Sequence, residues 1–223
     1  STQHDESITD TTLKEDKITT RGKLIVIEGP DGAGKSTQAN LIAERLRVIL
    51  HPKNRVMCMR EPGSTEAGES IRVLLKDPAI PIDTLSQLLL VYASRRQLTV
   101  EIEPILQAGD WVVLDRYEPS TIAYRPEIPE EVRWSMTKYL GFMVPDMYIF
   151  LDAGDEILLE RSRAKGAPDR WDHGDKYDML GRVRLYRDLR MWFKGVSVDT
   201  SIDTEETTAR KILELIIDGG LLV

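Results

Sequence analysis

Short apolar runs alternate with longer segments of helical periodicity along this chain of 223 residues. The apolar runs are found at 23–28, 55–60, 111–115, 147–152 and 196–199. Apolar residues at helical spacing predict helices near 36–50, 66–76, 83–107, 129–140, 154–165, 174–193 and 204–217. Continuous apolar strands separated by helices are typical of a parallel sheet covered on both faces. We therefore expect an α/β fold that binds its ligands at the carboxyl ends of the strands.

The first 21 residues differ from the rest of the chain. Residues 1–21 are polar, rich in Thr and poor in aromatic residues. They cannot bury enough apolar surface to offset the entropy lost on ordering, so we expect a mobile tail. Residues 22–223 show no internal repeat and no linker, which predicts a single domain.

Charge and cysteine content narrow the choice of partners. The chain carries 30 Lys and Arg residues against 37 Asp and Glu residues, for a net charge of −7. Nucleic-acid-binding domains usually show the opposite balance, so we expect small-molecule ligands and no nucleic-acid partner. Cys58 is the one cysteine, which excludes an internal disulfide and is expected of a cytoplasmic protein. No apolar run approaches the roughly 20 residues that cross a bilayer, so we expect no membrane association.

The stretch "EGPDGAGKSTQ", residues 28–38, follows the first apolar run and precedes a helical segment. It fits the P-loop pattern G-x-x-x-x-G-K-[ST], in which backbone N–H groups and the positive helix N-terminus face phosphates. Lys35 supplies a mobile positive charge, and the Ser36 hydroxyl is placed to ligate Mg²⁺. The residues expected to contact ATP are Gly29, Asp31, Gly32, Ala33, Gly34, Lys35, Ser36 and Thr37.

A P-loop by itself leaves a GTPase, an ATPase motor and a small kinase open. The chain has no N-K-x-D tetrapeptide with which to recognise guanine, and this weighs against a GTPase. A motor usually has a larger body. The size of the chain and its other anion-binding groups favour a small kinase.

Two later segments carry further groups for phosphate and metal binding. In "LDRYEPSTIAY", residues 114–124, Asp115 ends a predicted strand and is expected to hold Mg²⁺ with Ser36. Arg116 follows, where a guanidinium can span two phosphate groups, although a surface ion pair is the simpler alternative. In "RSRAKGAPDR", basic residues surround a Gly-Ala-Pro breaker. We expect a lid around 161–172 that neutralises phosphate charge, against the alternative of a solvated helix end. The expected lid cations are Arg163, Lys165 and Arg170.

These segments together resemble the thymidylate kinase family. The resemblance runs from about residue 22 to residue 217 and rests on "EGPDGAGKSTQ", "REPGSTEAGESIR", "ASRRQ", "DRYEPSTIAY", "VPDMYIFLD", "RSRAKGAPDR" and "VDTSIDTEE", in that order. It implies a P-loop NTPase fold with a five-stranded parallel sheet flanked by helices on both faces. It also implies a homodimer that transfers the γ-phosphate of ATP to dTMP, with Mg²⁺ as the cofactor.

The resemblance also implies roles for single residues. Asp31 looks like the acid that holds the 3′-hydroxyl of the acceptor, and Tyr124 like the tyrosine that favours deoxyribose. Gly32 stands where the eukaryotic type has arginine, so the bacterial type is implied, in which the lid provides the catalytic cation. Lys165 stands where the bacterial pattern often has arginine. It keeps the positive charge but lacks the planar, forked set of donors of a guanidinium. The residues expected around the acceptor are Asp31, Glu61, Pro62, Arg72, Val91, Arg95, Arg116, Thr121, Tyr124 and Arg125.

Two positions depart from the family near the acceptor base. The family usually places an aromatic residue where this chain has Val91, and often a glutamine where it has Arg125. A kinase for another deoxynucleoside monophosphate, or for several, is the first alternative. An inactive nucleotide-binding regulator is the second, against which the intact Lys35, Ser36 and Asp115 argue.

Overall fold

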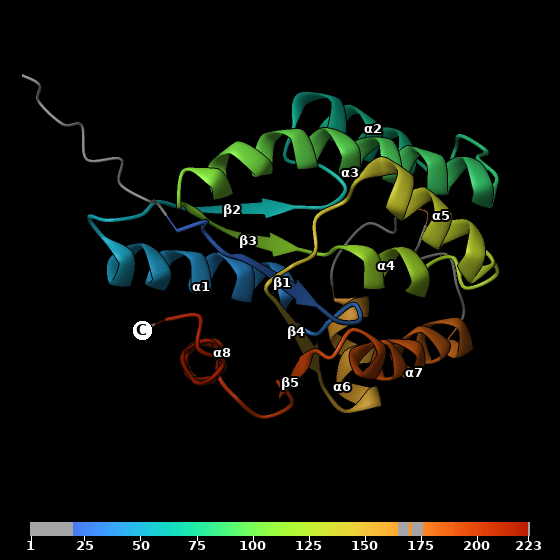
Figure 1. Cartoon of the computed structure of the whole chain (residues 1–223). Helices are drawn as coiled ribbons and strands as arrows, with labels where there is room; N and C mark the ends of the chain where they lie inside the picture. Colours follow the sequence, from blue (N-terminus) through green and yellow to red (C-terminus); the bar gives the residue numbers. More distant parts are fainter. Residues whose placement is uncertain (1–19, 165–169, 171–175, 223) are drawn as a thin grey trace, which may run out of the picture.

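The computed structural model describes residues 20–164, 170 and 176–222. Its centre is a sheet of five parallel strands in the order β2-β3-β1-β4-β5 (Figure 1). The strands are β1 (Leu24–Glu28), β2 (Val56–Arg60), β3 (Trp111–Asp115), β4 (Met147–Asp152) and β5 (Val196–Asp199). The five-stranded parallel sheet is thus confirmed, and every strand begins or ends within one residue of its predicted run. The predicted tail lies outside the described residues, apart from its last two.

The two central strands are buried on both faces, which explains why they read as continuous apolar runs. Ile25 and Ile27 belong to the core under α1 (Lys35–Leu50) and α8 (Glu205–Asp218). Leu24 and Val26 point to the opposite face and pack against α3 (Thr84–Gln107). Alternate residues of one strand therefore serve two cores.

The remaining helices complete both layers and surround the carboxyl edge of the sheet (Figure 1). They are α2 (Glu66–Lys76), α4 (Glu118–Ala123), α5 (Glu130–Leu140), α6 (Asp155–Arg163) and α7 (Lys176–Trp192). Seven helices match their predicted segments within two residues at each end. The short helix α4 was not predicted, because six residues with Pro119 in the first turn carry no helical periodicity.

The register of the sheet gathers the strand-end carboxylates. Ile27 pairs with Asp115, and Asp152 pairs with Asp199, so the acidic ends of neighbouring strands lie at one edge. The P-loop leaves β1 at this same edge, as expected for ligand binding in a parallel sheet. Within the described residues, no helix is long and apolar enough to cross a bilayer.

Alanine substitutions at two glycines, Gly195 and Gly181, should change the stability of the fold in opposite directions. A Cβ on Gly195 would lie 2.4 Å from Cδ2 of Phe150 and 3.2 Å from the carbonyl oxygen of Tyr148. Gly195→Ala should therefore destabilise the fold by about 1–3 kcal/mol through overpacking. Gly181 lies within α7 with open space around a Cβ, so Gly181→Ala should stabilise it by about 0.5–1 kcal/mol. Chemical denaturation measures both, and equal stability of the two variants would contradict the packing argument.

Candidate active site

The loop between β1 and α1 forms an anion-binding cradle. Gly29 and Gly32 have positive φ angles of 138° and 83°, and a Cβ on either would lie within 2.7 Å of a backbone carbonyl oxygen. Gly34 caps α1 with φ of 89° and has open space where a Cβ would stand. The loop therefore needs glycines for its path and leaves its inner side free for a ligand at the helix N-terminus.

Lys35 begins α1 and folds back over this loop. Its Nζ donates to the carbonyl oxygen of Pro30 at 2.7 Å and lies 3.8 Å from Oδ1 of Asp31. The side chain is buried. A lysine held by a carbonyl and a carboxylate of its own loop is positioned to exchange these partners for phosphate oxygens.

Ser36 and Asp115 form a pair that suits a divalent cation. The hydroxyl of Ser36, in the first turn of α1, donates to Oδ2 of Asp115, the last residue of β3, at 2.5 Å. Oδ1 of Asp115 is buried and accepts no hydrogen bond within the described residues. Within the residues that the structure describes, no cluster of three or more His, Cys, Asp or Glu side chains that could hold a metal ion is found. Mg²⁺ usually takes one or two protein ligands together with water and substrate phosphate, so this donor set fits it.

Asp31 connects the P-loop to the helix after β3. Its Oδ1 accepts from Nη2 of Arg116 at 2.6 Å, and its Oδ2 accepts from the hydroxyl of Tyr124. Arg116 also donates to the hydroxyls of Ser120 and Tyr186, both at 3.1 Å. Burial raises the pKa of Tyr124, so its hydroxyl stays a donor. Three residues predicted to contact the acceptor, Asp31, Arg116 and Tyr124, are thus brought together.

Glu28 was not predicted to have a role, but its carboxylate positions the cluster of Asp31, Arg116 and Tyr124. Its fully buried carboxylate accepts from the backbone N–H groups of Tyr117 and Ser120, at 2.6 and 3.2 Å, and from the Ser120 hydroxyl at 2.8 Å. Burial raises the pKa of this carboxyl, and the charge of Arg116 opposes the rise. The only signal in the sequence was an acid at the end of an apolar run.

Arg95 is the centre of a second buried network. Its Nε donates to both oxygens of Glu61, at 2.8 and 2.9 Å, and Nη2 donates to Thr121 at 2.6 Å. Nη1 pairs with Glu118, a residue that was not predicted. Burial raises the pKa of Glu61 to about 7, against the charge of Arg95. Glu61 precedes a cis proline, Pro62, whose carbonyl accepts from Nη1 of Arg72 at 3.0 Å.

Comparison with known proteins explains this arrangement. Residues 27–209 match the model of the thymidylate kinase family. A thymidylate kinase of Legionella pneumophila is 34% identical over 217 residues, which cover 90% of this chain and 98% of that protein. One of Burkholderia vietnamiensis is 38% identical over 158 residues, covering 68% and 76%.

Comparison with solved structures points to the same family. The thymidylate kinase of Candida albicans superposes with a TM-score of 0.71 at 25% identity, covering 91% of this chain and 94% of that one. That of Ehrlichia chaffeensis gives 0.69 at 28% identity, covering 88% and 99%. The chain belongs to the thymidylate kinase family.

The two positions that depart from the family are both buried. Val91 is 4% exposed and packs among Leu75, Leu88 and Ile128. Arg125 is 3% exposed, and within the described residues its Nε and Nη2 have no hydrogen-bond partner. These two nitrogens lie on one edge of the guanidinium and form a donor fork. Burial lowers the pKa of Arg125 to about 10, and the charge of Arg95 adds to this effect.

The predicted lid cations of this thymidylate kinase family member are placed differently from one another. Arg163 ends α6 with an exposed side chain. Lys165 lies outside the described residues. Arg170 donates from Nε to the carbonyl oxygen of Leu75 at 2.9 Å, and from Nη2 to those of Asp77 and Ile80. Its guanidinium thus binds carbonyl oxygens at and just after the C-terminal end of α2.

Proposed function

We infer that this chain is a thymidylate kinase, which transfers the γ-phosphate of ATP to dTMP and gives dTDP and ADP. The observation that carries this inference is the family match over residues 27–209 in a fold that keeps the P-loop and the strand-end aspartate. An inactive regulator would not be expected to keep Lys35, Ser36, Asp115 and Arg116 together.

We propose that the donor phosphates bind the backbone N–H groups of residues 29–34 and the N-terminus of α1, in the manner of other P-loops. Lys35 would leave Pro30 and pair with the transferring phosphoryl group. Ser36 and Asp115 would hold Mg²⁺, which when bound neutralises phosphate charge. These roles are supported by the open side of Gly34 and by the unpaired oxygen of Asp115.

We propose that Arg116 and the lid act on the acceptor and transferred phosphates. Arg116 is close enough to Asp31 to reach a phosphate beside the P-loop. Arg163 and Lys165 would supply the lid charge that is realised in the transition state. Arg170, whose guanidinium holds α2, would anchor the lid to the rest of the protein.

The acceptor nucleoside would lie between α3 and α4. Asp31 and Tyr124 would contact its sugar, and Arg72 its phosphate. Arg95 is held by Glu61 and Glu118 and so presents fewer free donors to a base. The buried donor fork of Arg125 would take up this role, because unpaired buried donors are costly until an acceptor reaches them. Carbonyl oxygens of a pyrimidine base are such acceptors.

A broader choice of acceptor base is the second candidate function. Val91 provides no aromatic surface on which a base can stack, and base stacking on an aromatic residue is worth roughly 1–3 kcal/mol. The Candida albicans relative is described as having broad substrate specificity. A cytoplasmic location and a homodimer remain predictions.

Replacing Lys35 tests the phosphoryl-transfer assignment. Lys35→Ala should lower kcat by about 10²-fold or more, because the positive charge acts on the transferring group. The melting temperature should change little, since the side chain donates mainly to the P-loop itself. A coupled assay of ADP release measures the rate, with Lys53→Ala, an exposed lysine, as control. Retention of more than roughly a tenth of the wild-type rate would contradict the assignment.

A panel of acceptors tests the base pocket. We expect dTMP to be the best substrate, dUMP to follow within about tenfold because one methyl group adds little, and purine monophosphates to be poor. Arg125→Met should lower kcat/KM for dTMP and dUMP by roughly ten- to a hundredfold, the range of a hydrogen bond to a charged group. The effect on dCMP should be smaller, since it lacks the second base carbonyl.

Arg96→Met, which makes the same substitution at an exposed arginine of α3, is the matched control and should leave every ratio unchanged. Equal losses for dTMP and dCMP in Arg125→Met would show that Arg125 supports the fold and does not contact the base. A preference for dGMP would overturn the pyrimidine assignment while leaving the phosphate chemistry in place.

Apolar side chains on the outer surface of α2 and α3 generate a prediction about assembly. Val73, Leu85 and Leu89 are 71%, 52% and 50% exposed. We expect a twofold dimer that covers them, so light scattering should give about twice the chain mass of 25.3 kDa. Leu89→Asp should produce a monomer. Val48→Asp, on the opposite layer and 80% exposed, should leave the dimer intact. A wild-type monomer at micromolar concentration is the contrary result.

A further inference from the structure

The two terminal nitrogens of Arg116 are held by groups of different kinds. Nη2 donates at 2.6 Å to Oδ1 of Asp31, a charged partner in the P-loop. Nη1 donates at 3.1 Å to two neutral oxygens, the hydroxyls of Ser120 and Tyr186. A phosphate repels the carboxylate and can take its place at Nη2, whereas it does not repel the hydroxyls. Nη1 is therefore the fixed end of this guanidinium, and Nη2 is the end that can turn to a phosphate.

The fold of α7 brings the hydroxyl of Tyr186 to this place. Tyr186 and Leu189 lie three residues apart on one face of the helix, and both are buried. They belong to a core that also contains Ile122 and Ala123 of α4. The tyrosine ring is thus packed against α4, and its hydroxyl meets Ser120 on the same helix. Burial raises the pKa of Tyr186, so the hydroxyl keeps its proton.

The number of protons on these side chains fixes the direction of the hydrogen bonds. Ser120 has one hydroxyl proton and donates it to Oε2 of Glu28 at 2.8 Å. In the 2.8 Å contact between the two hydroxyls, Tyr186 is therefore the donor. The tyrosine oxygen still accepts from Nη1 of Arg116. One directed chain of hydrogen bonds runs from Arg116 through Tyr186 and Ser120 to Glu28.

This chain connects a cation to a buried carboxylate through two neutral hydroxyls. Hydrogen bonds that follow one another in this way polarise and strengthen each other. Without the tyrosine oxygen, Ser120 would lose its donor, and Nη1 of Arg116 would keep one of its two partners. The guanidinium would then be held less firmly, and the direction of Nη2 would be less well defined.

We propose that Tyr186 is a positioning residue for phosphoryl transfer. It fixes Nη1 of Arg116, so that Nη2 faces the acceptor phosphate when this phosphate replaces Asp31. An arginine that is misplaced by a fraction of an ångström loses much of its effect on a reacting group. The inference rests on the proposed function, in which Arg116 acts on the acceptor and transferred phosphates.

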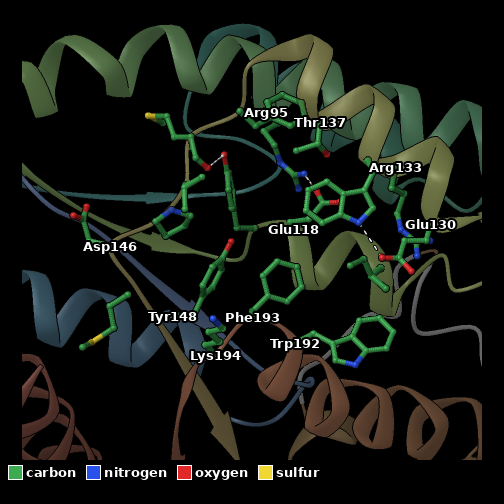
Figure 2. Close-up of a pocket in the computed structure, with 18 of the residues that line it drawn as sticks. Arg95, Glu118, Glu130, Arg133, Thr137, Asp146, Tyr148, Trp192, Phe193 and Lys194 are labelled. Carbon is green, nitrogen blue, oxygen red and sulfur yellow. Dashed lines mark hydrogen bonds and ion pairs between the residues drawn. The ribbon is translucent and has the colours of Figure 1, made fainter.

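Tyr117 offers a matched control. Its side chain is also buried, and its hydroxyl donates to a backbone carbonyl oxygen at 3.1 Å. Tyr117 lines a cavity of about 830 Å³ on whose wall Figure 2 shows Arg95 and Glu118, and neither Arg116 nor Tyr186 lines that cavity. Tyr117→Phe therefore removes one buried hydroxyl, as Tyr186→Phe does, without interrupting the chain that holds Arg116.

Turnover gives the first test. Tyr186→Phe should lower kcat/KM for the acceptor by about tenfold, the order of one lost hydrogen bond to a charged group. The KM for ATP should stay the same. Tyr117→Phe should keep the wild-type kcat/KM, although both variants should lower the melting temperature by similar amounts. A wild-type kcat/KM in Tyr186→Phe would overturn the proposal.

Equilibrium binding separates an effect through Arg116 from a general loss of structure. Because dTMP and thymidine differ by the phosphate, Tyr186→Phe should weaken the binding of dTMP and leave that of thymidine unchanged. When Arg116→Met is already present, Tyr186→Phe should weaken neither ligand further. A loss shared by thymidine, or one that persists in full beside Arg116→Met, would overturn the proposal.

This binding test does not depend on turnover or on the identity of the base. If another deoxynucleoside monophosphate binds more tightly than dTMP, that nucleotide and its nucleoside take the place of dTMP and thymidine. A failure of the dTMP assignment is then recognised in the wild type, whereas a failure of the role of Tyr186 is recognised in the variants.

Discussion

The buried carboxylate of Glu28 joins the central strand to α4, the helix that carries residues predicted to contact the acceptor. Glu28 is the last residue of β1, directly before the P-loop. Its carboxylate accepts hydrogen bonds from two backbone N–H groups and one hydroxyl at the start of α4. Breaking such a contact would leave buried donors without partners, which costs about 1–3 kcal/mol for each. Glu28 therefore fixes the distance between the phosphate cradle and α4.

The contacts between the P-loop, α3 and α4 depend on this distance between the cradle and α4. Arg116 follows β3 with a positive φ of 73°, a conformation that is costly for a residue with a side chain. This turn lets its guanidinium reach Asp31 in the P-loop. Farther along α4, Thr121 accepts from Arg95, and Glu118 pairs with the same guanidinium. One short helix thus connects the phosphate cradle with the buried network around Arg95.

Much of this architecture could be predicted from sequence. The strands and long helices were found because burial gives each a periodic pattern, and the P-loop because its glycines have a fixed spacing. Helix α4 was missed because a buried side chain from β1 stabilises it, and periodicity does not record such a contact. The partners of Arg95 were also missed. Glu61 and Glu118 lie 34 and 23 residues away, and only the folded chain brings them together. The resemblance predicted a set of acceptor residues without showing which of them are already paired within the protein.

The positively charged side chains of this site fall into two kinds, which differ in the groups that neutralise them. Lys35 and Arg116 are held by oxygens of the loop and of Asp31, groups that a phosphate can replace. Arg95 is fully buried between two carboxylates and three aromatic rings, so moving it would leave charges uncompensated in the core. The first kind can turn toward a substrate, whereas the second holds the pocket in shape. Arg125 belongs to neither group, because two nitrogens of its buried guanidinium have no hydrogen-bond partner within the described residues. Burial and the like charge of Arg95 both lower its pKa. A buried guanidinium in that position is stabilised when an acceptor-rich ligand reaches it, so the proposed base contact falls on a residue in which the chain departs from its family.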